Sequence, residues 1–117
     1  MNRTYKLIVD NISENISLVR LNTSFIASRL DFNIEEIEDI KVSVSEAVNY
    51  QLNISEKTEI EFLITNNEIQ IDVINENLHK KEMNGTSDKF AKMILETLMD
   101  KVVFGEKKIH LSKKLKD

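Results

Sequence analysis

Residues 33–50 read NIEEIEDIKVSVSEAVNY, and this stretch decides the fold because it carries the signals of a complete amphipathic helix. Asn33 is a favourable N-cap residue, and Glu36 stands three positions later, where its side chain can complete a capping box. Apolar residues then recur at helical spacing and form one face, at Ile34, Ile37, Ile40, Val44 and Val48. The sequence predicts a helix that packs this face in a core and presents Glu46 near its end.

The other segments show strand or helix periodicity in turn. Helical spacing predicts a helix over 13–29 and another that begins at Ser87 or Asp88 and runs to about residue 100. Alternating apolar residues predict strands over 5–9, 59–65, 68–74, 101–104 and 107–115. Asn66-Asn67 suits a two-residue turn with positive φ, and residues 75–87 are expected to form a loop. The order β-α-α-β-β-α-β-β predicts one α+β domain over 1–117, built as a two-layer α/β sandwich.

The predicted first helix is apolar on two sides. One stripe contains Ile12, Ile16, Val19, Ile26 and Leu30. A second stripe contains Leu18, Leu21 and Phe25. We interpret one face of this helix as buried in the core and the other as a surface offered to a partner; the alternative is a helix covered by other parts of the domain.

The composition of the 117-residue chain excludes several classes of protein. No apolar run is long enough to span a membrane, and no signal peptide precedes the first strand. The absence of cysteine excludes disulfides and thiolate metal sites, and a net charge of −4 argues against nucleic acid as the main partner. We therefore expect a cytoplasmic protein. Six lysines lie in residues 101–117, and we interpret them as a solvated edge strand, with a docking surface as the alternative.

Four segments, taken in order, resemble the anti-sigma-factor serine kinases of the GHKL superfamily, which have the Bergerat or histidine-kinase-like ATPase fold. The segments are VRLNTSFIASRLDF (19–32), IEEIEDIKVSVSEAVNY (34–50), EIQIDVIN (68–75) and ILETLMDKVVF (94–104). The resemblance implies a mixed sheet covered on one face by helices. It also implies a homodimer through the N-terminal strand and first helix, and a sigma factor or its antagonist protein as partner.

The resemblance implies a catalytic role for Glu46, which matches a glutamate that acts as general base toward a serine hydroxyl. The family places an Mg²⁺-binding asparagine four residues later, where this chain has Tyr50. Asn49 lies one position earlier, about 100° around the helix, and is the candidate metal ligand that remains. The alternative for Glu46 is an exposed helix acid without a role.

Two further motifs of the family are altered. Asn75 stands where an aspartate accepts a hydrogen bond from adenine, and Asn77 and His79 replace the glycines that follow it. Lys89 and Ala91 replace the glycines whose amides bind phosphate ahead of the third helix. Lys89 is a candidate phosphate contact; the alternative is an ordinary surface lysine. Because three motifs are altered together, the sequence predicts that ATP binding is lost and that no cofactor is needed.

Arg20 and Arg29 are the candidate partner-binding residues. Arg20 matches an arginine of the family's partner-contact surface, with a solvated helix residue as the alternative. The leading hypothesis is a regulator that binds proteins without kinase activity. The alternatives are an active serine kinase that uses ATP and Mg²⁺, and a dimerisation module unrelated to sigma factors.

Overall fold

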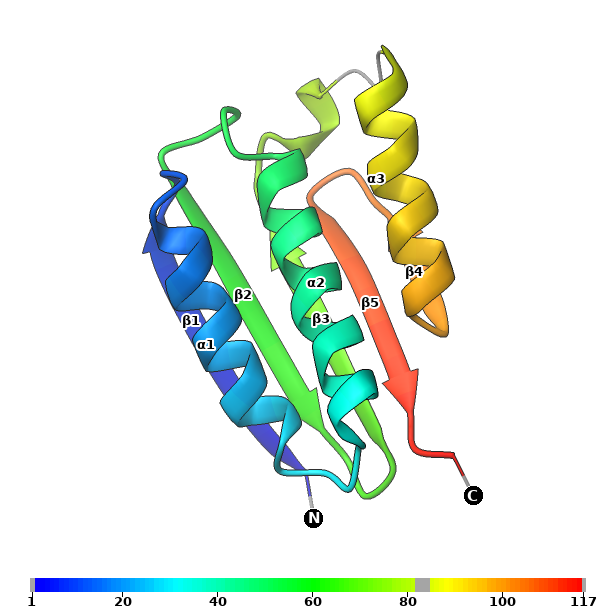
Figure 1. Cartoon of the computed structure of the whole chain (residues 1–117). Helices are drawn as coiled ribbons and strands as arrows, with labels where there is room; N and C mark the ends of the chain where they lie inside the picture. Colours follow the sequence, from blue (N-terminus) through cyan, green and yellow to red (C-terminus); the bar gives the residue numbers. More distant parts are fainter. Residues whose placement is uncertain (1, 82–84, 117) are drawn as a thin grey trace.

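The computed structural model describes residues 2–81 and 85–116, and it confirms the predicted order of helices and strands (Figure 1). One short 3₁₀ helix, η1, is added inside the predicted loop after the hairpin. The elements are β1 (Arg3–Asp10), α1 (Asn15–Ala27), α2 (Ile34–Tyr50), β2 (Lys57–Ile64), β3 (Glu68–Ile74), η1 (Leu78–Lys80), α3 (Gly85–Leu98), β4 (Lys101–Phe104) and β5 (Lys108–Lys114).

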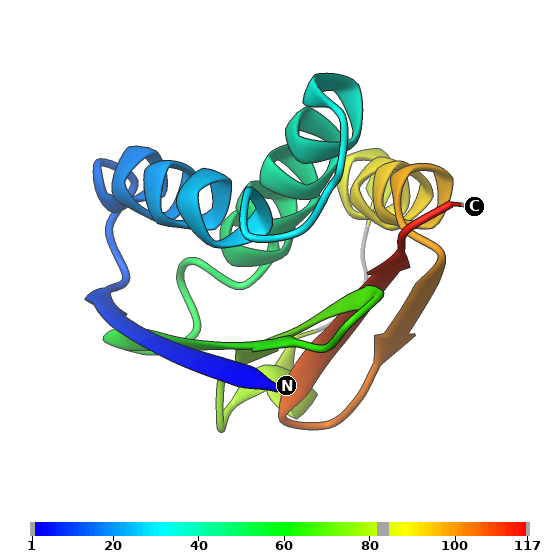
Figure 2. The same ribbon diagram turned by 90° about the horizontal axis from the view of Figure 1, so that it is seen from below.

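The five strands form one sheet in the order β1-β2-β3-β5-β4, and the three α-helices cover one face of it (Figure 2). This arrangement confirms the two-layer α+β sandwich. Each of the four strand pairings is antiparallel, so the expectation of a mixed sheet is wrong. The reason is that β5 returns between β3 and β4, which run in the same direction and would otherwise be parallel neighbours.

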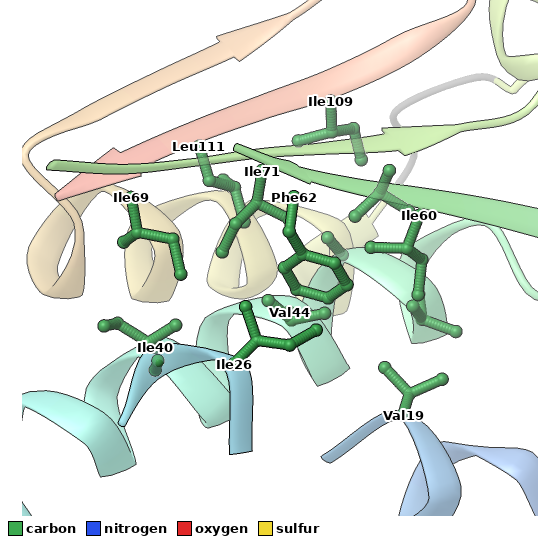
Figure 3. Packing of buried hydrophobic residues seen from close by; sticks show 14 of the residues in the cluster. Val19, Ile26, Ile40, Val44, Ile60, Phe62, Ile69, Ile71, Ile109 and Leu111 are labelled. Carbon is green, nitrogen blue, oxygen red and sulfur yellow. The ribbon is translucent and has the colours of Figure 1, made fainter. Parts of the chain in front are cut away.

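The core lies between the sheet and the helices (Figure 3). Alternate residues of the central strands point toward the helices, and their side chains are buried at Ile60, Phe62, Ile69, Ile71, Ile109 and Leu111. Val19 and Ile26 of α1 and Ile40 and Val44 of α2 meet them from the other layer. Burying each of these side chains stabilises the fold by about 1.5–3 kcal/mol, so the alternation within β2 and β3 sets their register.

The predicted capping box of α2 is confirmed. The Glu36 backbone N–H donates to Asn33 Oδ1 at 2.8 Å, and the Asn33 N–H donates to Glu36 Oε1 at 2.9 Å. The prediction that Ile34 faces the core is wrong, since this side chain is 83% exposed. Ile34 is the first residue of α2, and the apolar face meets the core only from Ile37, which is half-buried, and Ile40 onward.

Two predictions about chain reversals and helix starts are wrong. No non-glycine residue with positive φ occurs in the described part of the chain, so Asn66-Asn67 do not form the predicted turn type. The Leu115 N–H instead donates to the Asn67 carbonyl at 2.7 Å and joins this loop to the residue after β5. The third helix begins at Gly85, which has φ of 79°, so neither Ser87 nor Asp88 precedes it as a cap.

The prediction that the lysine-rich C-terminal strand is an edge strand is wrong, because β5 lies between β3 and β4. The edge strand on this side is β4. Lys113 is buried rather than solvated, and its ammonium donates to the Leu98 carbonyl at 2.8 Å. This bond caps the C-terminal end of α3 with a cation, where the helix dipole favours positive charge. In the described residues, no helix has the length and apolarity that crossing a membrane requires.

Candidate functional site

A cleft of about 450 Å³ lies between α2 and α3, and we call it the α2–α3 cleft. It is bordered by the last turns of α2, the residues that follow this helix, the residue after η1 and the first turns of α3. Its lining residues are Glu46, Asn49, Tyr50, Leu52, Asn53, Ile54, Lys81, Ser87, Asp88 and Ala91.

Two of the predicted site residues come together in this cleft. Glu46 is half-buried and Asn49 is exposed, and both belong to the regular helix α2. Because they are three residues apart on a helix, their side chains lie on the same side. A carboxylate and an amide oxygen therefore border the same space.

Tyr50 is packed at the back of the same cleft. Its ring contacts Phe104 of β4 edge-to-face, with centroids 5.4 Å apart and planes at 75°. The ammonium of Lys81 lies 4.9 Å from the centre of the Tyr50 ring. Burial, and secondarily the Asp88 carboxylate, raise the pKa of the Tyr50 phenol above its usual value. The residue at the family's metal position is therefore a neutral phenol held by an aromatic and a cation.

An ion pair lines the cleft. Lys81 Nζ lies 3.3 Å from Asp88 Oδ1, and the two side chains are only 26% and 15% exposed. The cleft thus contains the carboxylates of Glu46 and Asp88 and one ammonium group already paired with an acid. Within the described residues, no group of three or more His, Cys, Asp or Glu side chains is placed to hold a metal ion. The donor set fits an Mg²⁺ ion poorly.

Asn75, the predicted adenine contact, is buried in a polar network behind the cleft. Its amide donates to Gln51 Oε1, and its Oδ1 accepts from the Asn77 backbone N–H at 2.9 Å. Gln51 Nε2 in turn donates to Thr58 Oγ1 at 2.8 Å, and Thr58 donates to Asn11 Oδ1. Among described residues, Asn75 is outside the lining of the α2–α3 cleft and borders a separate hollow with Asn77. Sequence reasoning missed Gln51, because a polar residue directly after a helix carries no signal of a buried role.

The two residues at the family's phosphate-loop positions lie on different sides of α3. Ala91 is buried and lines the cleft, whereas Lys89 is exposed and lines a shallow hollow with Lys92, Met93, Glu96 and Thr97. Two residues along a helix turn the side chain by about 200°, which separates them. His79 is exposed in η1. The structure therefore brings Glu46 and Asn49 together and leaves Asn75 and Lys89 apart from them.

The predicted partner-binding arginines are both engaged within the domain. Arg20 is half-buried, and its Nη1 donates to Ser45 Oγ of α2 at 3.3 Å. The Arg29 guanidinium lies 5.8 Å from the centre of the Phe25 ring. Leu18, Leu21 and Phe25, which we call the α1 ridge, are 45%, 70% and 60% exposed. The α1 ridge is therefore the exposed apolar face of α1, and its partner remains a prediction.

Comparison with known proteins supports the resemblance over part of the chain. The chain matches no protein-family model. The serine-protein kinase RsbW of Listeria monocytogenes (serotype 4a, strain HCC23) is 39% identical over 66 residues, which make up 51% of this chain and 42% of that protein. RsbW of Bacillus pumilus (strain SAFR-032) is 46% identical over 50 residues, or 40% and 31% of the two chains. The resemblance to the anti-sigma-factor serine kinases is confirmed.

The match to each RsbW spans less than half the length of that protein. The crystal structure of the RsbU and RsbW domains of Rv1364c from Mycobacterium tuberculosis extends the likeness to 97% of this chain, with a TM-score of 0.68. This match is 12% identical in sequence and covers 32% of that chain, so it supports the fold and not the activity. The likeness in fold therefore extends over nearly the whole of this chain, while the sequence likeness to RsbW covers about half of it.

Proposed function

We propose that this chain is an anti-sigma-factor-like regulator in stress or sporulation control that acts in the cytoplasm by binding proteins and does not transfer phosphate. Its partners would be a sigma factor, the antagonist of an anti-sigma factor, or both. The partial identity to RsbW and the similar fold support the class of protein. The packing of Tyr50 supports the absence of kinase activity.

The position of Tyr50 carries the proposal. The phenol is neutral, its ring is packed against Phe104, and the Lys81 ammonium lies beside it. A nucleotide triphosphate needs cations or backbone N–H groups along its phosphates. Here the ammonium in the cleft is already paired with Asp88, and the side chain of Ala91 lies at the other candidate position. These contacts favour a cleft that has lost nucleotide chemistry.

The α1 ridge is the binding surface that we assign to the partner, together with the neighbouring Arg20 and Arg29. A contiguous set of exposed large apolar side chains on one helix is typical of a protein interface. In the described part of the chain, no strand pairs with the outer edge of β1, which is available to extend the sheet. A homodimer through β1 and α1 is therefore part of the proposal.

Two measurements test the proposal. Calorimetric titration with ATP and Mg²⁺ is expected to give no binding, and micromolar affinity would contradict the loss of nucleotide chemistry. A pull-down from the native cell, with the captured proteins identified by mass spectrometry, is expected to recover a sigma factor or its antagonist. The matched control is Leu21→Asp on the α1 ridge, which should abolish capture without unfolding the domain. Recovery of neither partner would favour a dimerisation or assembly module.

An active serine kinase is the second candidate, because Asn77 and His79 do not line the cleft and Glu46 and Asn49 do. In this alternative, Glu46 would accept the proton of the substrate serine and Asn49 would offer an oxygen to Mg²⁺. Transfer of labelled phosphate to an antagonist protein, lost in Glu46→Gln and retained in Glu76→Gln, would establish it. Absence of transfer from any nucleotide would exclude it.

A further inference from the structure

Lys81 joins three elements at the α2–α3 cleft. It follows η1 directly, and its ammonium contacts Asp88 in the first turn of α3 at 3.3 Å. The same ammonium lies 4.9 Å from the centre of the ring of Tyr50, the last residue of α2. Because both members of the ion pair are largely shielded from water, their attraction is screened less than that of an exposed pair.

The surroundings of Lys81 are electronegative. The C-terminal end of a helix carries partial negative charge, and α2, described along its whole length, has no basic residue in its last turn. The carboxylates of Glu46 and Asp88 border the same cleft. These two carboxylates carry like charges, and the C-terminal end of α2 adds to the negative potential. The ammonium of Lys81 brings a full positive charge to this place from outside both helices.

We propose that Lys81 is a built-in cation of the α2–α3 cleft, which holds the end of α2 against the start of α3. A bound divalent ion performs this task in clefts where acidic side chains from two elements converge. In this chain a side chain does so, and the two helices stay together without a metal or a nucleotide. This inference concerns the free chain and does not depend on the partner named in the proposed function.

A second path of contacts supports the same arrangement. The Tyr50 ring contacts Phe104, and the ammonium of Lys92 lies 5.9 Å from the centre of the Phe104 ring. Lys92 is one turn after Asp88 on α3. The start of α3 is therefore linked to Tyr50 at two points, directly through Lys81 and indirectly through Phe104. Apolar burial also holds α3, through the buried residues Ala91 and Leu95.

The test compares Lys81→Gln with Lys80→Gln, which removes the same charge from the adjacent, exposed residue. We expect Lys81→Gln to lower the thermal midpoint by about 5 °C and Lys80→Gln to leave it unchanged. Hydrogen exchange of the amides in the first two turns of α3 should become roughly tenfold faster in Lys81→Gln. Lys81→Arg keeps the charge and should retain most of the protection.

The two tyrosines of the chain, Tyr5 and Tyr50, provide a local readout. In Lys81→Gln the ring proton resonances of Tyr50 should shift while those of Tyr5 stay in place. Asp88→Asn provides a second variant, and the double variant Lys81→Gln/Asp88→Asn should exchange less fast than the sum of the two single effects predicts. Equal behaviour of Lys81→Gln and Lys80→Gln, or strict additivity with Asp88→Asn, would overturn the proposal. These measurements use the free protein, so they succeed or fail independently of partner capture.

Discussion

α1 and α3 lie on the same face of the sheet but are held there in different ways. α1 buries Val19, Thr23, Ile26 and Ala27 and leaves the α1 ridge exposed. α3 buries Ala91 and Leu95 and is joined to its neighbours by an ion pair and by contacts between cations and aromatic rings. The buried side chains anchor α1 to the core, and its outer side stays exposed. Charge and aromatic contacts hold α3 beside a cleft, with smaller energies per contact.

The largest expected loss of stability comes from the side of α1 that faces the core. Ile26→Ala removes a buried side chain that packs between the helices and the sheet, and we expect it to lower the free energy of unfolding by about 2–4 kcal/mol. Urea unfolding followed by circular dichroism measures this loss. Leu21→Ala, on the exposed ridge, is the matched control and should cost less than about 0.5 kcal/mol. Equal losses would mean that the ridge is buried in solution.

The network behind the cleft should give the next largest effect. Asn75→Ala leaves Gln51 Oε1 and the Asn77 N–H without their buried partners, which is expected to cost about 1–3 kcal/mol. Glu76→Ala changes the adjacent exposed residue and serves as the control. The same urea experiment compares the two variants. A loss in Asn75→Ala no larger than in Glu76→Ala would show that water replaces these bonds.

The aromatic contact beside α3 should contribute less. Phe104→Leu keeps an apolar side chain but removes the edge-to-face contact with Tyr50 and the ring beside the Lys92 ammonium. We expect this change to lower the free energy of unfolding by about 1 kcal/mol. Amide exchange in the first turns of α3 should rise, while exchange in α1 should not change. Val103→Leu, at the exposed neighbouring position of β4, is the control. A uniform rise in both helices would contradict the separate anchoring of α3.

The smallest effect concerns alkaline pH. Burial raises the pKa of Tyr50 in the folded state, so the folded chain holds this proton at pH values where the unfolded chain has released it. Stability therefore decreases as the pH rises above about 10, the usual pKa of tyrosine. Tyr50→Phe should flatten this decrease, and Tyr5→Phe should not. Thermal midpoints measured across the alkaline range would detect the difference, and identical profiles for the two variants would contradict it.

Much of the fold was predictable because local patterns contain the necessary information. The capping box at Asn33 and Glu36 needs only residues three positions apart, and the hairpin of β2 and β3 follows from strict alternation. The sequence-based predictions are wrong where contacts between distant segments decide the structure. Ile34 matched the helical period but lies beyond the core, and the Asn66-Asn67 loop is held by Leu115, from the other end of the chain.

The candidate site was predictable only in part. The position of Glu46 and Asn49 on one side of α2 follows from helical geometry, and the structure places both in the cleft. The cation of the cleft was not predictable, because a lysine-rich sequence does not reveal which ammonium meets which acid. Lys89 matches the family's phosphate-loop position, yet it faces outward, and Lys81, directly after η1, lines the cleft instead.

The sequence by itself determined the order of helices and strands, the inward faces of β2 and β3, and the resemblance to the anti-sigma-factor serine kinases. Periodicity, capping and family motifs are properties of neighbouring residues, so they can be read along the chain. Only the tertiary structure decided the place of β5 inside the sheet, the network around Asn75 and the pairing of Lys81 with Asp88. These features depend on which distant segments meet when the apolar faces of the sheet and helices are buried together.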